Sequence, residues 1–348
     1  MYNYILSPID IVILGEPLPF NSAEQTYRKS SSILNPIPFF ACLRKQSKNA
    51  KIHFISIIQE GRFLLPVPFD IAEVEGKVKL GKLQKSKKLF LSDSNDEYLI
   101  TFGEGKLKSI DDRNYVDSNW LEQYLMGEEK YLIDTQGMIK TYRPCDSEYR
   151  VGIQINHKTR TTEQGYLYFE NYLRFNNTEK TGFYLKTSVC IKDQILNLGG
   201  ESRVAQIENF CRDVDKEFVN QDKIKEKIKQ TGVFKIILLT PTNAPCEIDG
   251  AKLVAKIVRR PYIYSGWLRK DSKSFPSRLF RLIKPGAVFY YKIETEDVEG
   301  FITKLFEKFW LKPAFFKPDF PYFESIEGIN PICLGLTIIG ATEEVENE

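Results

Sequence analysis

Residues 51–70, KIHFISIIQEGRFLLPVPFD, contain two short apolar runs that meet at Glu60-Gly61. Short apolar runs separated by a glycine-containing turn are typical of a β-hairpin. The proline-led stretch before them, residues 35–46 (NPIPFFACLRKQ), favours a short helix, and residues 2–14 (YNYILSPIDIVIL) favour an opening strand. Strand, helix, strand, strand is the first part of a ferredoxin-like βαββαβ unit.

The pattern loosens from about residue 70 to residue 148, where lysine-rich and acidic stretches alternate. Strand character returns at residues 149–160, 165–175 and 182–191, whose connections carry Asn, Thr and Gly. We therefore expect a first domain over residues 1–200 with a large insertion at about 70–148.

The C-terminal part repeats this order in outline, which predicts a second ferredoxin-like domain over residues 201–348 and an α+β fold class. A helix over 214–232 is stopped by Gly232. The other expected elements are strands at 233–241, 251–260, 287–294 and 331–340 and a helix at 296–310. Residues 242–250 (TNAPCEIDG) are too short and turn-rich to support the first helix of that unit.

Composition describes an ordinary globular chain, with 42% hydrophobic and 27% charged residues and a net charge of +3. The six cysteines form no CxxC pair, which favours buried thiols in a reducing compartment. The first residues lack the pattern of a signal peptide, and no apolar stretch approaches the roughly 20 residues that span a bilayer. We expect a cytoplasmic protein without a membrane partner.

Enzyme motifs are missing. Of the two histidines, His53 lies in an apolar strand, as a core histidine does, and His157 lies in a polar connection, so no histidine-based metal centre can be assembled. There is no GxSxG pentapeptide, and FGEGKLKS (102–109) lacks a P-loop because Ile100 and Leu107 stand at key positions. We predict no catalytic residue, metal or cofactor.

Residues 256–284 combine basic and aromatic side chains with a single acid, Asp271. The basic residues are Lys256, Arg259, Arg260, Arg269, Lys270, Lys273, Arg278, Arg281 and Lys284, and the interleaved aromatic ones are Tyr262, Tyr264, Trp267, Phe275 and Phe280. Cations neutralise phosphates while aromatic faces stack on unpaired bases, so the segment favours single-stranded nucleic acid. An acidic protein partner or a solvated face remains an alternative.

Two further stretches are basic. In residues 156–175, His157, Lys158, Arg160, Thr161 and Thr162 offer hydrogen-bond donors before an aromatic strand, an arrangement suited to phosphate and sugar contacts. The second, Lys77 to Lys88, lies in the insertion and can equally be a solvated tail.

Residues 196–208, LNLGGESRVAQIE, place Gly199 and Gly200 directly before Glu201 and Arg203. Adjacent glycines reach positive φ and permit close approach of another backbone or a phosphate. From the residues alone, the stretch is a tight turn, a nest for an anion or part of a docking surface.

Five motifs occur in the order of one family: VILGEPLPFN (12–21), IPFFACLRK (37–45), VGIQINHKTRTTEQGYLY (151–168), LGGESR (198–203) and PGAVFYY (285–291). Together they resemble the third subunit of the Cmr complex, a family of RAMP proteins in type III-B CRISPR effectors. The resemblance implies a non-catalytic subunit of two ferredoxin-like (RRM-like) RAMP domains, which holds the 5′ handle of the guide RNA in antiviral defence. Its implied partners are the large polymerase-cyclase subunit and the backbone RAMP subunits.

Carried onto this chain, the resemblance implies that Arg44, Arg160, Thr161, the Gly199-Gly200 pair and Arg203 position the RNA. Glu201 would orient Arg203 or cap a turn, because a carboxylate is repelled by phosphates. The chain departs from the family at residues 15–18 (GEPL), where members often carry arginines, and at the glycine-rich loop, where SIEGINPICLG (325–335) is sparse in glycine.

Two alternatives remain. One is a RAMP-type, metal-independent endoribonuclease that processes precursor guide RNA, with His157 and Tyr166 or Tyr168 as its acid-base pair. The other is an interaction module whose arginines meet acidic faces of neighbouring subunits.

Overall fold

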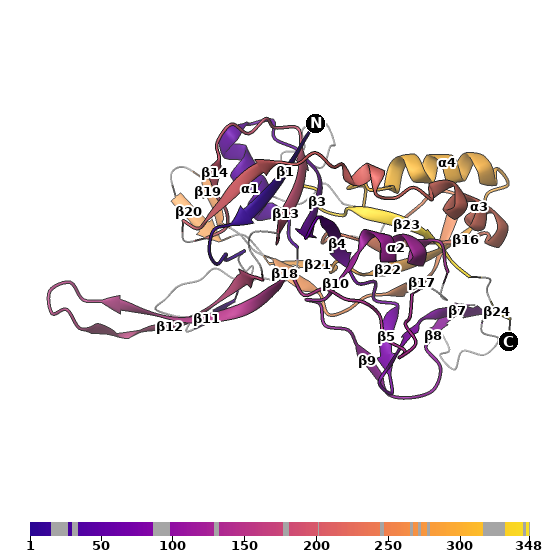
Figure 1. Ribbon diagram of the computed structural model, residues 1–348, viewed down its shortest axis with the longest axis horizontal. Coiled ribbons are helices and arrows are strands. Elements are labelled where there is room, and N and C mark those ends of the chain that lie inside the picture. Colours follow the sequence, from indigo (N-terminus) through magenta and orange to yellow (C-terminus); the bar gives the residue numbers. More distant parts are fainter. Residues whose placement is uncertain are drawn as a thin grey trace.

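The computed structural model describes residues 1–14, 27–29, 34–85, 98–128, 132–176, 181–200, 202–243, 247–264, 267–270, 273–276, 279–315, 331–343 and 346–347. These residues form a mixed α/β molecule with many antiparallel sheets and few helices (Figure 1). None of the helices in these ranges is both long and apolar enough to cross a membrane.

The N-terminal half is built on a seven-stranded sheet with the order β10-β4-β3-β13-β1-β15-β14. Its strands are β1 (Tyr2–Pro8), β3 (Ile52–Gln59), β4 (Arg62–Pro66), β10 (Tyr115–Asp117), β13 (Thr181–Thr187), β14 (Ile195–Asn197) and β15 (Val204–Asn209). The predicted opening strand, the helix α1 (Ile37–Gln46) and the β3-β4 hairpin are confirmed. Glu60 and Gly61 have φ angles of 50° and 75°, the left-handed conformations that a two-residue hairpin turn requires.

The predicted succession strand, helix, strand, strand takes the wrong strand as the third of the unit, since that strand is β13 and not β4. The strand between β1 and β3 is β13, which pairs antiparallel with both, whereas β4 pairs with β3 on its other side. Every residue of β13 is buried, as suits a central strand. No helix lies between β13 and β15 in the described residues there. The pairing of β1 with a strand about 180 residues later is a long-range contact that local sequence pattern does not encode.

The insertion is more ordered than its composition predicted. It forms two small sheets in a lobe below the main body, β6-β5-β9 and β7-β8, and β24 from the last residues of the chain joins the second sheet beside β7 (Figure 1). The strands are β5 (Ile71–Val74), β6 (Lys77–Leu80), β7 (Lys82–Lys85), β8 (Tyr98–Thr101), β9 (Leu107–Ser109) and β24 (Glu346–Asn347). The basic segment Lys77 to Lys85 is thus in strands, and residues 86–88 lie outside the described residues. The helix α2 (Ser118–Leu125) begins where the Asp117 carboxylate accepts from the Trp120 amide.

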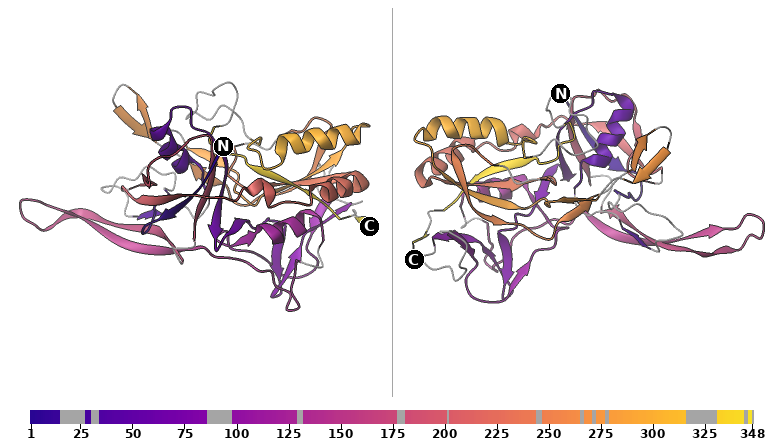
Figure 2. Two further views of the ribbon diagram at one scale, coloured as in Figure 1. Left: turned by 45° about the horizontal axis from the view of Figure 1, so that its top comes forward. Right: turned by 180° about the vertical axis from the view of Figure 1, so that it is seen from behind.

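The C-terminal half has a four-stranded sheet with the order β17-β22-β16-β23. It consists of β16 (Val233–Leu238), β17 (Ala251–Ile257), β22 (Val288–Ile293) and β23 (Thr337–Ala341), with α3 (Gln221–Thr231) and α4 (Val298–Phe309) side by side on one face (Figures 1 and 2). The predicted strands and both helices are confirmed, and a short 3₁₀ turn (Val214–Lys216) precedes α3. Gly232 ends α3 with φ 67°. The described residues of 239–250 contain no helix, as expected.

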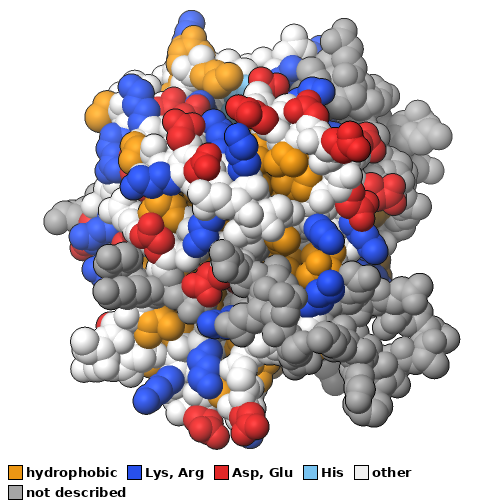
Figure 3. Space-filling view, turned by 90° about the vertical axis from the view of Figure 1, so that its right-hand side faces the viewer, with side chains coloured by type: hydrophobic (Ala, Val, Ile, Leu, Met, Phe, Trp, Pro, Cys, Tyr) orange, Lys and Arg blue, Asp and Glu red, His pale blue; other side chains and the backbone are white. Residues whose placement is uncertain are grey.

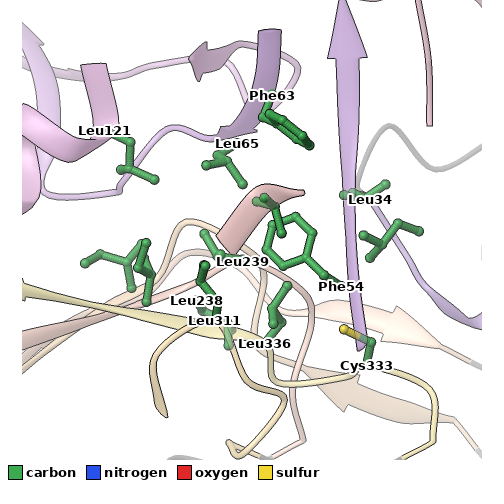
Figure 4. Packing of buried hydrophobic residues seen from close by; sticks show 14 of the residues in the cluster. Leu34, Phe54, Phe63, Leu65, Leu121, Leu238, Leu239, Leu311, Cys333 and Leu336 are labelled. Atoms are coloured by element: carbon green, nitrogen blue, oxygen red, sulfur yellow. The ribbon is translucent and has the colours of Figure 1, made fainter. Parts of the chain in front are cut away.

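The two halves share one continuous hydrophobic core. Leu65 and Leu121 from the first half lie close to Leu238 and Leu239 from the second (Figure 4). A buried polar contact joins the halves as well, because the Tyr124 and Tyr290 hydroxyls donate to Asp70 Oδ2 at 2.5 and 2.6 Å. Burial raises the pKa of Tyr124 well above its usual value. The halves therefore pack as one body.

A long hairpin of β11 (Cys145–Ile155) and β12 (Thr162–Phe175) projects from this body (Figures 1 and 2). A short strand, β2 (Tyr27–Lys29), pairs with β12. The basic segment 256–284 continues from β17 into two small pairs, β18 (Tyr262–Tyr264) with β21 (Phe280–Leu282) and β19 (Trp267–Lys270) with β20 (Lys273–Pro276).

Candidate nucleic-acid interface

Four predicted site residues lie together at the tip of the β11-β12 hairpin, at the end farthest from the body (Figure 2). These residues, His157, Lys158, Arg160 and Thr161, are all exposed. Asn156 shapes the turn through two hydrogen bonds. Its backbone N–H donates to Thr161 O at 2.9 Å, and its side-chain Oδ1 accepts from the backbone N–H of Lys158 at 3.0 Å. Arg160 has φ 54°. The turn therefore presents its cations and hydroxyls to solvent on a defined backbone.

One face of the hairpin is apolar and exposed. Val151 is paired with Phe169, and Ile153 with Leu167, so their side chains share a face. The exposed fractions are Tyr149 67%, Val151 61%, Ile153 46%, Ile155 49%, Leu167 47% and Phe169 43%. Contiguous apolar surface of this kind marks a binding face. The period of two in residues 149–155 is visible in the sequence, but the exposure of that face is not.

The opposite face is polar at the root of the hairpin. Glu148 accepts from Arg150 Nε at 2.8 Å and from Arg174 Nε on the neighbouring strand. The hydrogen bond with Arg174 lowers the pKa of Glu148 to about 2. Arg174 Nη2 also lies 3.2 Å from Asp10 Oδ1. The root is thus cross-linked to the segment that follows β1.

The double glycine closes a tight turn against this same segment. Gly199 has φ 83°, and a Cβ there would lie 2.3 Å from Ile13 O. The Gly200 amide donates to Ile13 O at 3.0 Å, and the Leu198 amide donates to Arg203 O at 2.8 Å. Of the three uses open from the sequence, the structure shows the tight turn, on the chain's own backbone. RNA contact by Gly199 and Gly200 stays a prediction, and Glu201 lies outside the described residues.

Arg203 faces the root of the hairpin. Its guanidinium lies 5.1 Å from the centroid of the Tyr172 ring, and its Nη1 lies 3.7 Å from Asp10 Oδ2. Its Nε is buried and has no hydrogen-bond partner in the described residues. The structure therefore gives Arg203 neighbours within its own chain.

The basic-aromatic segment 256–284 is only partly exposed. Arg259 Nη1 donates to Ile110 O at 2.7 Å and to Asp112 Oδ1 at 2.6 Å, and its guanidinium lies 4.1 Å from the Phe69 ring centroid. Tyr262 and Tyr264 are buried. Arg259 is thus held within the fold and the two rings pack in the core, which disfavours an RNA surface at these three side chains, and RNA contact by Arg259 stays a prediction.

The remaining predicted arginines are separate from one another. Arg260 is exposed beside Arg259, and Arg44 is exposed at the end of α1, 5.9 Å from the Phe40 ring centroid. Arg269 lies on β19, and its side chain lies outside the described residues. The end of the molecule on the side of α3, α4 and the C-terminus mixes Lys and Arg with Asp and Glu (Figure 3). Charge is thus not segregated on that face.

The geometry disfavours one acid-base pairing of the nuclease alternative. Tyr168 is paired with Gly152, which precedes Ile155 by three residues, or about 10 Å along the strand. His157 lies beyond Ile155, so its backbone is farther still from that of Tyr168 along the hairpin. The other histidine, His53, lines a hollow of about 700 Å³ between the halves, and burial, followed by Lys186 and Lys51, lowers its pKa. Within the described ranges no three His, Cys, Asp or Glu side chains gather as a metal site would require.

Comparison with known proteins gives the family. Residues 4–303 match the model of the family described as CRISPR-associated protein (Cas_Cmr3). One relative, the CRISPR system CMR subunit Cmr3 of Saccharolobus solfataricus, is 25% identical over 126 residues, which span 33% of this chain and 39% of that protein.

Two solved chains are also similar. One belongs to a type III-B Cmr-beta complex bound to cognate target RNA and AMPPnP, with 16% identity, coverage of 83% of this chain and 86% of that chain, and a TM-score of 0.48. The other belongs to the complex bound to cognate target RNA, with 18% identity, coverage of 87% and 89%, and a TM-score of 0.46. Since the family model covers most of the chain, the protein belongs to the Cmr3 family of CRISPR-associated proteins.

Proposed function

We propose that this chain is the non-catalytic RNA-binding subunit of a type III-B CRISPR (Cmr) effector complex and holds the 5′ handle of the guide RNA in antiviral defence. Family membership supports the assignment to the complex. The observation that carries the RNA-binding role is the projecting β11-β12 hairpin, because its tip is polar and cationic while one of its faces is apolar and exposed.

The tip of the hairpin suits the sugar-phosphate backbone of an RNA strand, and the apolar face suits its bases. Lys158, Arg160 and the hydroxyl of Thr161 are placed to contact phosphates and sugars, which sets register without reading sequence. Tyr149 and Phe169 expose ring surface on which unpaired bases can stack. Arg44 and Arg260 are exposed cations that can extend the phosphate contacts.

The same proposal covers fold and partners. The strand orders β3-β13-β1-β15 and β17-β22-β16-β23 both follow the ferredoxin-like order, although each unit lacks one helix in its described residues. We assign these units to the two domains predicted at 1–200 and 201–348, with the boundary moved past β15 (Val204–Asn209), because that strand pairs with β1 in the first unit. We propose that the chain works in a cytoplasmic complex with the large polymerase-cyclase subunit and the backbone RAMP subunits as partners. The shared core supports a rigid scaffold.

Filter binding to guide RNA with an intact or a scrambled handle tests this function, using the chain alone and with its large partner subunit. Handle recognition predicts tighter binding to the intact handle, and equal affinity for both RNAs across salt concentrations would overturn it, because phosphate contacts alone are sequence-blind.

A matched pair of variants locates the RNA-binding surface. The double substitution Lys158→Gln, Arg160→Gln should lower affinity and reduce the salt slope by about 0.7 for each phosphate that the variant no longer neutralises. Lys223→Gln with Lys304→Gln, two exposed lysines on α3 and α4, removes the same charge elsewhere and should leave affinity unchanged. Cleavage of a labelled repeat RNA that is abolished in His157→Ala would favour the endoribonuclease instead.

A further inference from the structure

We infer that Asp10 and the residues of the turn at Gly199 are positioning residues that fix the direction of the β11-β12 hairpin. They thereby also fix the position of its tip. We call this set of contacts the root clamp: Asp10, Ile13, Gly199 and Arg203 on the body, and Glu148, Arg150, Tyr172 and Arg174 on the hairpin. Its purpose rests on the proposed function, since a hairpin that holds RNA must point in one direction.

The segment Ile9–Leu14 is a principal support of the hairpin. Val12 and Leu173 exchange two backbone hydrogen bonds of 2.9 Å each. Ile11, Ile13 and Tyr172 form a small buried cluster that is separate from the main core. Near its base the hairpin also pairs with β2, and Phe175 enters the main core. Because the hairpin contacts the body only near its base, its direction depends strongly on each of these contacts.

Asp10 is the ionic centre of this support. Its carboxylate lies 3.2 Å from Arg174, 3.8 Å from Arg150 and 3.7 Å from Arg203. The three guanidinium groups come from β12, β11 and the glycine turn, so one carboxylate holds three segments together. The Tyr172 ring centroid lies 5.7 Å from the guanidinium carbon of Arg150 and 5.1 Å from that of Arg203.

The charge balance distinguishes a clamp from a phosphate site. Among the root side chains that the structure describes, the three arginines are matched by three carboxylates: Asp10, Glu148 and the buried Glu170, which lies opposite Arg150 and accepts from the Tyr172 hydroxyl. A site for phosphate needs a surplus of positive charge, because carboxylates repel phosphates at short range. With the charges balanced, these arginines position the hairpin and the tip contacts RNA.

The glycine turn supports the clamp from the other side. Because Gly199 has no Cβ, the turn approaches Ile13 closely, and the Gly200 amide binds Ile13 O. The Leu198–Arg203 hydrogen bond closes the turn and brings Arg203 over Tyr172. Contacts therefore run from the turn through the segment Ile9–Leu14 to the hairpin. They join the motif at residues 198–203 with the motif at residues 151–168.

A distance measurement on the full chain tests the clamp without RNA. Spin labels at Thr159→Cys on the tip and Lys304→Cys on α4 report the hairpin direction by pulsed electron resonance, after the exposed Cys190 and Cys211, and Cys246, are replaced by Ser. We expect a narrow distribution in this background and a broader or shifted one in Asp10→Asn and in Arg203→Gln. Asp10→Glu, which keeps the carboxylate, should give a distance distribution nearly as narrow as that of the background.

Controls keep the outcome specific. Glu60→Gln, which removes an exposed ion pair with Arg62 at another turn, should not change the distribution. Circular dichroism confirms that each variant is folded. Unchanged distributions in both Asp10→Asn and Arg203→Gln would overturn the inference.

The handle-RNA assay on the same variants separates the two proposals. If the unsubstituted chain does not discriminate handles, the proposed function fails, while the distance data still decide the clamp. If it does, Asp10→Asn and Arg174→Gln should each weaken binding several-fold with an unchanged salt slope. A slope that falls by about 0.7 in Arg174→Gln would show that this arginine contacts a phosphate, and would overturn the positioning role.

Discussion

Arg259 Nη1 lies 2.6 Å from Asp112 Oδ1, and this ion pair joins the segment after β17 to the insertion of the N-terminal half. Lys284 Nζ lies 2.7 Å from the other oxygen of the same carboxylate. The side chains are 18%, 27% and 20% exposed in the order Arg259, Asp112, Lys284, so the cluster is largely withdrawn from water. Two cations of the basic-aromatic segment thus contribute to the packing of the halves.

Arg259→Gln should therefore lower stability rather than RNA affinity. Loss of the guanidinium leaves Asp112 and Ile110 O with fewer partners in a partly buried place, at a cost of about 1–3 kcal/mol in the free energy of unfolding. Urea denaturation measures the change. Arg260→Gln is the matched control, because its neighbouring side chain is exposed and its loss should leave stability unchanged. Equal stability of the two variants would contradict the structural role of Arg259.

Gly199→Ala should be more destabilising than Gly76→Ala. Both glycines have positive φ, 83° and 81°, so both substitutions strain the backbone. Only at Gly199 does the new methyl group meet a neighbour, Ile13 O, at 2.3 Å, whereas nothing lies within 4 Å at Gly76. Thermal unfolding of the two variants compares them directly, and a similar decrease for both would show that the close approach is unimportant.

Stability should fall as the pH drops below about 6.5, and His53 should contribute to the decrease. Burial, followed by Lys186 and Lys51, lowers the pKa of His53 below its usual 6.5, so the unfolded chain binds a proton before the folded chain does. The contribution is fully present above the unfolded pKa and is lost as pH falls towards the folded pKa. Melting temperatures between pH 7.5 and 5.5 measure it. His53→Gln should flatten that part of the profile, and an unchanged profile would assign the dependence to other groups.

Tyr290→Phe should destabilise the joint between the halves by about 1 kcal/mol, because Asp70 loses one of its hydroxyl donors in a buried place. Tyr2→Phe is the control, since that ring is 43% exposed. Chemical denaturation of both variants gives the difference. No loss in Tyr290→Phe would mean that another group replaces the hydroxyl.

Tyr149→Ala and Phe169→Ala should leave stability almost unchanged and weaken RNA binding. Both side chains are exposed, 67% and 43%, so the fold loses little burial. Each base that stacks on one of these rings would lose about 1–3 kcal/mol of binding free energy. Filter binding and thermal unfolding on the same samples separate the two effects. A loss of stability with unchanged binding would assign this face to packing.

Local signals predicted most of the elements. The proline entry of α1, the Glu60-Gly61 turn and the glycine end of α3 act within a few residues, so the chemistry of the turn and the cap is readable from the chain. The strand order was less readable, because the place of β13 between β1 and β3 depends on contacts between residues far apart in sequence.

The candidate site divides in the same way. The chain by itself determined that the cations of residues 157–160 lie in a turn between two strands, since Asn, Thr and Lys favour such a connection. Only the tertiary structure decided that Arg259 is held by Asp112 while Arg260 is exposed, and that Tyr262 and Tyr264 are buried. Local sequence determines turns and caps, but exposure depends on which distant segments pack against a side chain, and that is set by the summed contacts of the whole fold.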